Sequence, residues 1–577
     1  MQCDGGQESK ERAFRKPLHF NALRFHDTAK LVETGHFCRP VDAGCCGSIF
    51  PPRTMMWPFA RAACHPVVLS SRFFMHRDVY VAQLSALLEQ RVDVNAHVVD
   101  GTHVWGFFRA AMYFPLVEAF GPDRVPADMA QRLAAAFDTA MRRRGLPMTA
   151  VRDNAPVGSM VPPGDGPVVV AASGPSHHRN SHGLHESPVA DAWVRLLRAD
   201  GHAVLKLDLL PSWFTTNQPR RLPGVSLPPV TDLDRHRSAI LVKERWVPAI
   251  VALFSQIVPI LQREVGIDLS SAVSGLIARA VAFVAEREAV GRWLDLVQPR
   301  TIAFICYYET CYLSLISAAR ERGIPTVDLQ HGMNGTVHAA YTHWTALPAD
   351  GYDVLPDWFL TWGEPSSDNL RRWWPAQTRH RALVGGRHDL DPTAPLTDDT
   401  QVAALAARAR AAARCILVTL QDEPLDPILL AEMRAAPADW VWVLRPHPSS
   451  VRIPEASAEA ATAQLAAADV RTAVVVPLNV GTLADLMQLA DFHITGTSSS
   501  WMDAWVYDVP TAFIHPGAGQ LFATEIADGL AHFVPNGRGV CALIAGEAPR
   551  RLAIAAAVVE RSPEVARRAL ATILSRP

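Results

Sequence analysis

The chain has 577 residues, of which 49% are apolar and 19% charged, a balance that excludes a mainly disordered protein. Lys and Arg number 55 and Asp and Glu number 57, so the formal net charge is −2. This charge excludes the broad basic surface of a general nucleic-acid-binding protein. At roughly 150 residues per domain, the length predicts about three or four domains.

The cysteines give no sign of a metal site or a disulfide framework. The chain has 9 of them, with no CxxC pair and no Cys/His spacing typical of zinc. An odd number fits free thiols in a reducing compartment. The first residues also lack the apolar core of a signal peptide. We therefore expect a cytoplasmic protein that holds no metal.

The N-terminal part divides into two segments. Residues 1–60 show no sustained hydrophobic period, and we expect them to be poorly ordered. Residues 61–160 carry helical patterns at 79–90 and 127–144, which predict a helix-rich N-terminal extension. The segment at 151–166 is rich in Pro and Gly and indicates a linker.

After this linker, strand patterns alternate with helical patterns. The apolar run at 167–172 is typical of a buried parallel strand. A polar linker near 386–400 separates one such series from a second. We therefore predict an α/β protein whose two Rossmann-like domains, at 161–388 and 389–577, face a cleft. Ligands of such sheets bind beyond the carboxyl ends of the strands.

The most apolar stretch of the chain lies at 246–261. Pro248 and Pro259 interrupt it, and the charged tripeptide Lys243-Glu244-Arg245 precedes it. It is shorter than the roughly 20 residues that a bilayer span needs. We interpret it as a buried helix, with contact to a membrane surface as the alternative.

Three motifs follow predicted strands. The first is Gln330-His331-Gly332. A histidine has an ordinary pKa of about 6.5 and can accept a proton from a hydroxyl nucleophile. Gly332 permits a tight turn or the close approach of a ligand. The alternative is a histidine that only hydrogen-bonds the turn.

The second motif is Arg445-Pro446-His447-Pro448. Its two prolines fix the backbone around His447. The guanidinium of Arg445 matches the geometry of phosphate oxygens. The alternative is a rigid turn with an incidental histidine.

The third motif is the run Thr495-Gly496-Thr497-Ser498-Ser499-Ser500, which opens a predicted helix. Small hydroxyl residues cap a helix start, and the free N–H groups there suit a phosphate. Asp503 lies one turn inside this helix, where it can face the ribose hydroxyls of a nucleotide. An ordinary helix cap is the alternative.

The order of these motifs resembles that of GT-B glycosyltransferase-type proteins. It is similar to the group of CDP-glycerol glycerophosphotransferases, capsule polysaccharide transferases and bacterial sialyltransferases. The sialyltransferases have an HP motif and then a Ser-rich motif, both contacting the CMP part of the donor. These match His447-Pro448 and Ser498-Ser499-Ser500 here. The acidic pair that serves as their base is absent from the first half, which argues against sialic acid.

In the glycerophosphotransferases a histidine before a glycine is the expected base, and His331 matches it. Two serines, an acidic residue and a later proline follow in that family, as Ser498, Ser499, Asp503 and Pro510 do here. The resemblance covers roughly residues 165–577. Trp105 and Arg109 also resemble part of an N-terminal motif of capsule-type transferases.

The resemblance implies an enzyme that transfers a sugar or polyol phosphate from a nucleotide-activated donor, with CMP or CDP expected first. The acceptor would be a hydroxyl of a surface polysaccharide or a lipid-linked glycan. His331 would act as the base. Donor binding would fall to Arg445, His447, Thr497, Ser498, Ser499, Ser500 and Asp503. No metal or further cofactor is implied, and peripheral association with the inner face of the membrane is possible.

Other residues are weaker candidates. Glu309 follows a strand and is either a second acid or base or a carboxylate at a helix start. Gln330, His177 and His178 are expected on the acceptor side, the last two in a loop rich in histidine. Two alternative functions stay open: a nucleotide-sugar 2-epimerase on the same fold, and a non-catalytic protein that binds a glycan or nucleotide.

Overall fold

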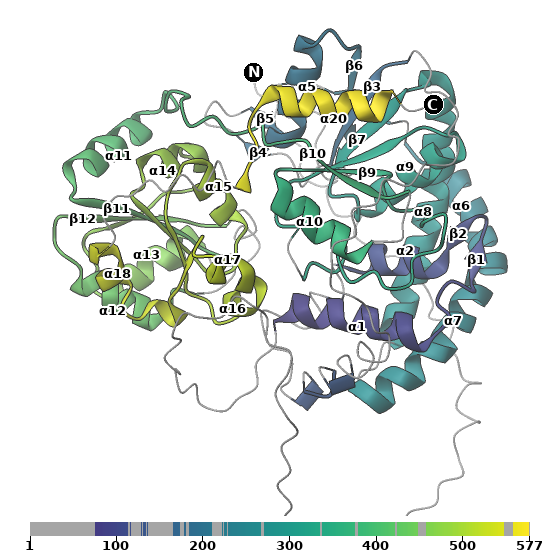
Figure 1. Ribbon diagram of the computed structural model, residues 1–577, viewed down its shortest axis with the longest axis horizontal. Coiled ribbons are helices and arrows are strands. Elements are labelled where there is room, and N and C mark those ends of the chain that lie inside the picture. Colours follow the sequence, from purple (N-terminus) through teal and green to yellow (C-terminus); the bar gives the residue numbers. More distant parts are fainter. Residues whose placement is uncertain are drawn as a thin grey trace, which may run out of the picture. The chain divides into compact units, whose positions relative to one another are not determined.

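The chain forms two parallel six-stranded sheets covered by helices (Figure 1). The computed structural model describes residues 76–113, 116, 128–129, 131–133, 135–136, 166–173, 178–179, 184–209, 222, 224–227, 229–266, 270–334, 337–374, 379–421, 424–447, 457–546 and 558–575. The poor order predicted for residues 1–60 and the acceptor-side position predicted for His177 concern residues outside this set. Much of the segment 61–160 also lies outside it.

The described part of the N-terminal extension begins with α1 (Arg77–Arg91), which confirms the helical pattern at 79–90. A short antiparallel hairpin follows, β1 (Val98–Val99) and β2 (Thr102–His103), and it leads into α2 (Val104–Ala111). All eight residues of α2 are buried, because its VWGFFRAA sequence is apolar around most of the helix.

The first sheet has the strand order β10-β9-β8-β7-β3-β6. Its strands are β3 (Val168–Ser173), β6 (Val204–Leu209), β7 (Thr301–Ile305), β8 (Thr326–Leu329), β9 (Trp358–Thr361) and β10 (Arg381–Val384). Strands β3, β7, β8 and β9 are buried along their whole length, as expected for parallel strands covered on both faces.

The helices of this domain are α5 (Pro188–Ala199), α6 (Asp232–Leu241), α7 (Val247–Ile260), α8 (Ser270–Val297), α9 (Thr310–Glu321) and α10 (Glu364–Trp373). The π-helical turn η2 (Val242–Trp246) joins α6 to α7, and a second one, η3 (Leu261–Val265), follows α7. Together they form one continuous helix from Asp232 to Val265. A small hairpin pairs β4 (His178–Arg179) with β5 (His185–Glu186).

The second sheet has the order β13-β12-β11-β14-β15-β16. Its strands are β11 (Arg414–Thr419), β12 (Trp440–Arg445), β13 (Ala473–Val475), β14 (Phe492–Thr495), β15 (Thr511–Phe513) and β16 (His532–Phe533). Its helices are α11 (Thr400–Ala411), α12 (Pro427–Ala435), α13 (Ala458–Ala467), α14 (Leu483–Leu489), α15 (Ser500–Val506), α16 (Ala518–Leu521), α17 (Ala523–Ala527) and α18 (Val540–Gly546). The predicted fold class, an α/β protein with two Rossmann-like domains, is confirmed.

The last helix, α20 (Pro563–Leu574), returns to the first domain. Its buried residues Ala566, Ala569, Leu570 and Ile573 belong to the hydrophobic core of the first domain. The predicted range 389–577 for the second domain therefore includes a helix that packs in the core of the first. An amphipathic helix does not reveal from its sequence which apolar surface it covers.

A buried cation, Arg387, ties the end of the first sheet to the second domain. Its guanidinium binds Asp389, with Nε 3.1 Å from Oδ1, and Asp503 of α15, with Nη2 2.5 Å from Oδ1. It also lies 3.9 Å from the ring centre of Trp362. The backbone N–H of Arg387 donates to the carbonyl of Glu560 at 2.8 Å, so the segment that leads to α20 joins the same contact.

We expect Arg387→Met to destabilise the protein by about 3–5 kcal/mol, because the carboxylates of Asp389 and Asp503 lose their shared cation. The measurement is the midpoint of urea-induced unfolding. Arg371→Met is the matched control: Arg371 is 44% exposed and pairs with Glu364, so its loss should cost less than about 1 kcal/mol. Equal midpoint shifts for the two variants would contradict the role given to Arg387.

Candidate functional site

The motif Gln330-His331-Gly332 leaves the carboxyl end of β8. Gln330 is only 1% exposed. Its Oε1 accepts the N–H of Trp362 at 2.7 Å, and its Nε2 donates to the carbonyl of Gly332 at 2.9 Å. Both ends of the amide therefore hold the turn that carries His331. These contacts give Gln330 a positioning role and do not support a direct contact with an acceptor.

His331 is half-buried, and its Nδ1 has no hydrogen-bond partner among the described residues. Burial lowers its pKa to about 4, and the neighbouring His338 adds to the shift. The imidazole is therefore uncharged at neutral pH and able to accept a proton, although the lowered pKa makes it a weaker base.

Aromatic side chains surround this histidine. The ring of Tyr308 lies 6.3 Å from that of His331, and its hydroxyl is 3.4 Å from Nε2 of His338. His338 stacks on Tyr113 at 4.5 Å, and the Tyr113 hydroxyl donates to Asp78 of α1 at 2.8 Å. The N-terminal extension thus supplies part of the wall beside His331. This contact could not be predicted from the sequence, because Asp78 and Tyr113 are far from His331 along the chain.

Glu309 immediately precedes α9, beyond the carboxyl end of β7. Burial raises its pKa to about 7, while hydrogen bonds from Ser173 and Cys306 oppose the shift. Protonated and ionised forms therefore coexist near neutral pH, as a group that works as both acid and base requires. Between β7 and Glu309 the chain turns through Cys306, whose φ of 64° is rare for a residue with a side chain.

Arg445 does not present its guanidinium to a ligand. Its two terminal nitrogens donate to the carbonyls of Pro477, Val480, Leu478 and Gly481 at 2.6, 2.8, 3.1 and 3.2 Å. These four bonds use every N–H of both nitrogens. Arg445 therefore holds the loop after β13, and its predicted contact with donor phosphate is not supported. His447 follows it and is half-buried.

The hydroxyl residues after β14 have different surroundings. Thr497 donates through its N–H and its hydroxyl to Oε1 of Gln421, both at 2.7 Å. Ser498 accepts the N–H of Ser500 at 3.3 Å, and the buried Ser500 hydroxyl lies 2.8 Å from that of Thr419. Ser499 alone of the three serines is exposed. The sequence predicted free N–H groups at this helix start, but those of Thr497 and Ser500 already have partners, and the exposed group of the motif is the hydroxyl of Ser499.

Asp503, predicted to meet ribose hydroxyls, is engaged by Arg387 at 2.5 Å. A carboxylate held by a buried guanidinium is a poor partner for a ligand hydroxyl. This ion pair gives Asp503 a role in joining the domains, and its place in donor binding stays a prediction.

The His-Gly turn and the Ser-rich turn come together. A Cβ placed on Gly332 would lie 3.8 Å from the Oγ of Ser499. Gly332 belongs to the first domain and Ser499 to the second, so the turns that carry the two motifs contact one another between the domains. Parallel register brings the remaining motif to the same edge of the second sheet, because Thr419 of β11 pairs with both Arg445 and Thr495.

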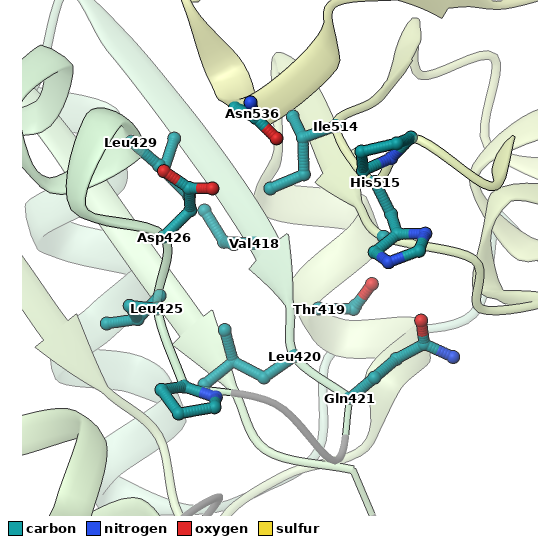
Figure 2. Close-up of a pocket in the computed structure, with 13 residues that line it drawn as sticks. Val418, Thr419, Leu420, Gln421, Leu425, Asp426, Leu429, Ile514, His515 and Asn536 are labelled. Carbon is teal, nitrogen blue, oxygen red and sulfur yellow. The ribbon is translucent and has the colours of Figure 1, made fainter. Parts of the chain in front are cut away.

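A cavity of about 90 Å³ opens at this edge of the second sheet (Figure 2). Figure 2 shows Gln421 and His515 on one side and Asp426 and Leu429 on the other. Seven of the residues that line it are apolar: Val418, Leu420, Pro424, Leu425, Leu429, Ile514 and Pro516. The others are Thr419, Gln421, Asp426, Gly496, His515 and Asn536. The cavity thus combines an apolar surface with amide, imidazole and carboxyl groups.

Sequence reasoning missed Gln421, His515 and Asn536. The first two follow strands β11 and β15 within two residues, so the rule that ligands bind beyond strand ends would have found them. Gly496 has a spatial reason that the sequence could not show: a Cβ there would lie 2.9 Å from Oε1 of Gln421. In the part of the chain that the structure describes, no three His, Cys, Asp or Glu side chains gather to hold a metal.

No family model matches this chain, and no curated protein matches it in sequence. Among solved structures, it is similar to UDP-GlcNAc 2-epimerase from Neisseria meningitidis bound to UDP-GlcNAc, at 12% identity and a TM-score of 0.42, over 71% of this chain and 100% of that one. It is also similar to a UGT transferase from Siraitia grosvenorii in complex with UDP, at 13% identity and a TM-score of 0.40, over 70% and 99%.

Glu309→Gln tests the environment of Glu309. Because its folded pKa of about 7 exceeds the ordinary value of 4.5, its contribution to stability is complete below about pH 4.5 and is lost as pH rises through 7. The glutamine variant, which cannot ionise, should match wild type at pH 4.5 and exceed it at pH 8 by on the order of 2 kcal/mol.

The measurement is the urea unfolding midpoint at both pH values. Glu459→Gln, on the exposed side of α13, should show no such pH-dependent gain. A Glu309→Gln effect of the same size at both pH values would contradict the raised pKa.

Proposed function

We propose that the protein transfers a sugar or polyol phosphate from a nucleotide-activated donor to an acceptor hydroxyl. The observation that carries the proposal is the approach of Gly332, beside the uncharged His331, to the exposed Ser499. This arrangement sets a proton acceptor from one domain against a hydroxyl and a cavity of the other, as a reaction between two bound substrates requires.

The cavity of the second domain is the proposed site of the nucleotide base. The side chains of Leu420 and Ile514 offer apolar surface to the faces of a planar ring. The Nε2 of Gln421, whose Oε1 is occupied by Thr497, can donate to its edge, and the amide of Asn536 can both donate and accept. A cytidine nucleotide stays our first choice, on the resemblance of the HP and Ser-rich motifs to those of transferases with CMP- and CDP-linked donors.

In the proposed reaction, His331 takes the proton of the acceptor hydroxyl as its oxygen attacks the donor. The new bond joins this oxygen to the transferred group, and the bond from that group to the nucleotide breaks. We assign to His447 and Ser499 the stabilisation of the charge that develops on the leaving nucleotide. This assignment replaces Arg445, whose guanidinium is occupied. We infer a cytoplasmic enzyme that acts on a surface polysaccharide or lipid-linked glycan without a metal.

Donor binding is tested by thermal shift with CMP-, CDP-, UDP- and GDP-linked compounds. Wild type should be stabilised by one nucleotide class above the others, by about 2.7 kcal/mol at 100 times the dissociation constant. Gln421→Leu and His447→Ala should each remove most of that shift. Arg445→Lys should lower the stability of the protein itself. Indifference to all four classes would contradict a donor site.

His331→Ala should leave the donor-induced shift intact and lower turnover by about 10²–10⁴-fold, because it removes only the base. His236→Ala, at an exposed position of α6, is the matched control and should retain activity. Loss of donor binding with unchanged turnover per bound donor would reverse the roles given to His331 and His447.

A 2-epimerase on the same fold is the second candidate, because it would use carboxyl groups as acid and base. The first domain holds two carboxyls with pKa values near neutral: burial raises that of Glu309 to about 7 and that of Asp328 to about 8. Asp328 is fully buried and accepts from the hydroxyl of Tyr341 at 3.0 Å, which leaves Glu309 as the accessible one.

Incubating the enzyme with the donor alone in deuterated water separates the two candidates. The transferase should leave the donor unchanged until an acceptor is added. Deuterium at C2 of the donor sugar without any acceptor, lost in Glu309→Gln, would establish the epimerase.

A further inference from the structure

Helix α7 is apolar on both of its sides. Its inner side packs in the core of the first domain. The four residues on that side are at most 3% exposed: Ile250, Leu253, Phe254 and Ile257. Its outer side is solvent-exposed, yet four of its six exposed residues are apolar, Pro248, Val251, Ala252 and Pro259, and two are polar, Ser255 and Gln256. A helix that is apolar all round is ordinarily enclosed by protein or lipid. The apolar residues on the outer side of α7 are therefore unusual for a helix face in contact with water.

The same continuous helix, from Asp232 to Val265, bears further exposed apolar side chains. Leu233 is 56%, Ile240 44% and Val251 50% exposed. Of the six large apolar residues that stand out as exposed in the described part of the chain, these three lie on this one helix. We call the exposed side of residues 233–259 the outer face.

The hairpin of β1 and β2 extends this face. Asp100 binds Arg245 at 2.5 Å, and the ring of His97 lies 3.3 Å from the amide of Gln256. These two contacts fix the hairpin along the helix. Between His97 and Asp100 the chain exposes another large apolar side chain, Val98, which is 48% exposed.

The outer face also carries an excess of cations: Arg235, Arg237, Lys243 and Arg245 are exposed, against one exposed carboxylate, Glu244. Arg235 and Arg245 pair with Asp232 and Asp100. Arg237 and Lys243, by contrast, are exposed and have no acidic partner among the residues that the structure describes. Apolar residues interspersed with free Lys and Arg are typical of helices that lie in the surface of an anionic bilayer.

We propose that the outer face docks on an anionic lipid surface, with the helix lying in the plane of the membrane. By length and composition the helix, 34 residues long, could also cross a bilayer. Crossing would expose Ile250, Leu253 and Phe254, which complete the core of the first domain, so the helix lies on the membrane and does not span it. A second copy would bring the same excess of positive charge against this face, whereas an anionic lipid surface complements it.

Docking through this face would bring the first domain, which carries His331, to the membrane surface. Helix α2 packs against both α7 and α9, and α9 begins directly after Glu309. Lipid docking does not depend on the proposed transfer reaction. It is measured without donor or acceptor, so its failure and the failure of the transferase proposal are distinguishable.

The experiment is co-sedimentation of the full chain with vesicles of phosphatidylcholine, with and without phosphatidylglycerol. We expect binding to the anionic vesicles that weakens with added salt. The double variant Arg237→Glu/Lys243→Glu should lower the partition coefficient by about tenfold or more. Val251→Glu should also lower it, whereas Val251→Leu, which stays apolar, should retain binding.

Arg410→Glu/Arg434→Glu is the matched control, because it makes the same charge change at exposed positions of α11 and α12. It should bind as wild type does. Failure of wild type to bind either vesicle would overturn the proposal, as would equal losses in the control. A dimer in analytical ultracentrifugation that Val251→Glu dissociates would overturn it too, since a second copy would then cover the face.

Discussion

Parallel register is the constraint on which the site depends. Hydrogen bonds between β11 and its neighbours place Thr419 opposite both Arg445 and Thr495, so the turns that follow these strands leave one edge of the sheet together. In the first sheet, Leu329 pairs with Ile305 and Leu360, which brings the turn of His331 to the edge where Glu309 lies. A shift of register would separate these groups however well each strand were buried.

Burial decides which polar groups near that edge remain available. A charged group removed from water must be paired, and the nearest partner is often the backbone. Arg445 accordingly bonds four carbonyls, and Asp503 pairs with Arg387. The exposed Ser499 and the half-buried His331 lie at this edge without such an ion pair. The charged residues of the motifs, Arg445 and Asp503, thus bond other groups of the protein and stabilise the structure around the site.

The N-terminal extension contributes to the same edge through a buried ion pair. Glu89 of α1 binds Arg109 of α2 at 2.5 Å, and Arg109 donates to the carbonyl of His343 at 3.0 Å and stacks 3.9 Å over Trp344. The segment from His338 to Trp344 is thereby anchored to both helices. Because His338 lies beside His331, the extension influences the environment of the proposed base although it belongs to neither sheet.

The sequence by itself determined the fold class and the places of the three motifs. Buried parallel strands are continuous apolar runs, and the turns after them must leave the carboxyl edge. Only the tertiary structure decided the partners. Arg445 bonds the loop after β13, Asp503 pairs with Arg387, Gln421 and His515 line a cavity, and α20 packs in the core of the first domain. These outcomes depend on residues far apart along the chain. The local sequence pattern indicates which residues are buried and which form helices or strands. The hydrogen-bond and ion-pair partners of a side chain depend on which distant residues the folded chain brings close to it.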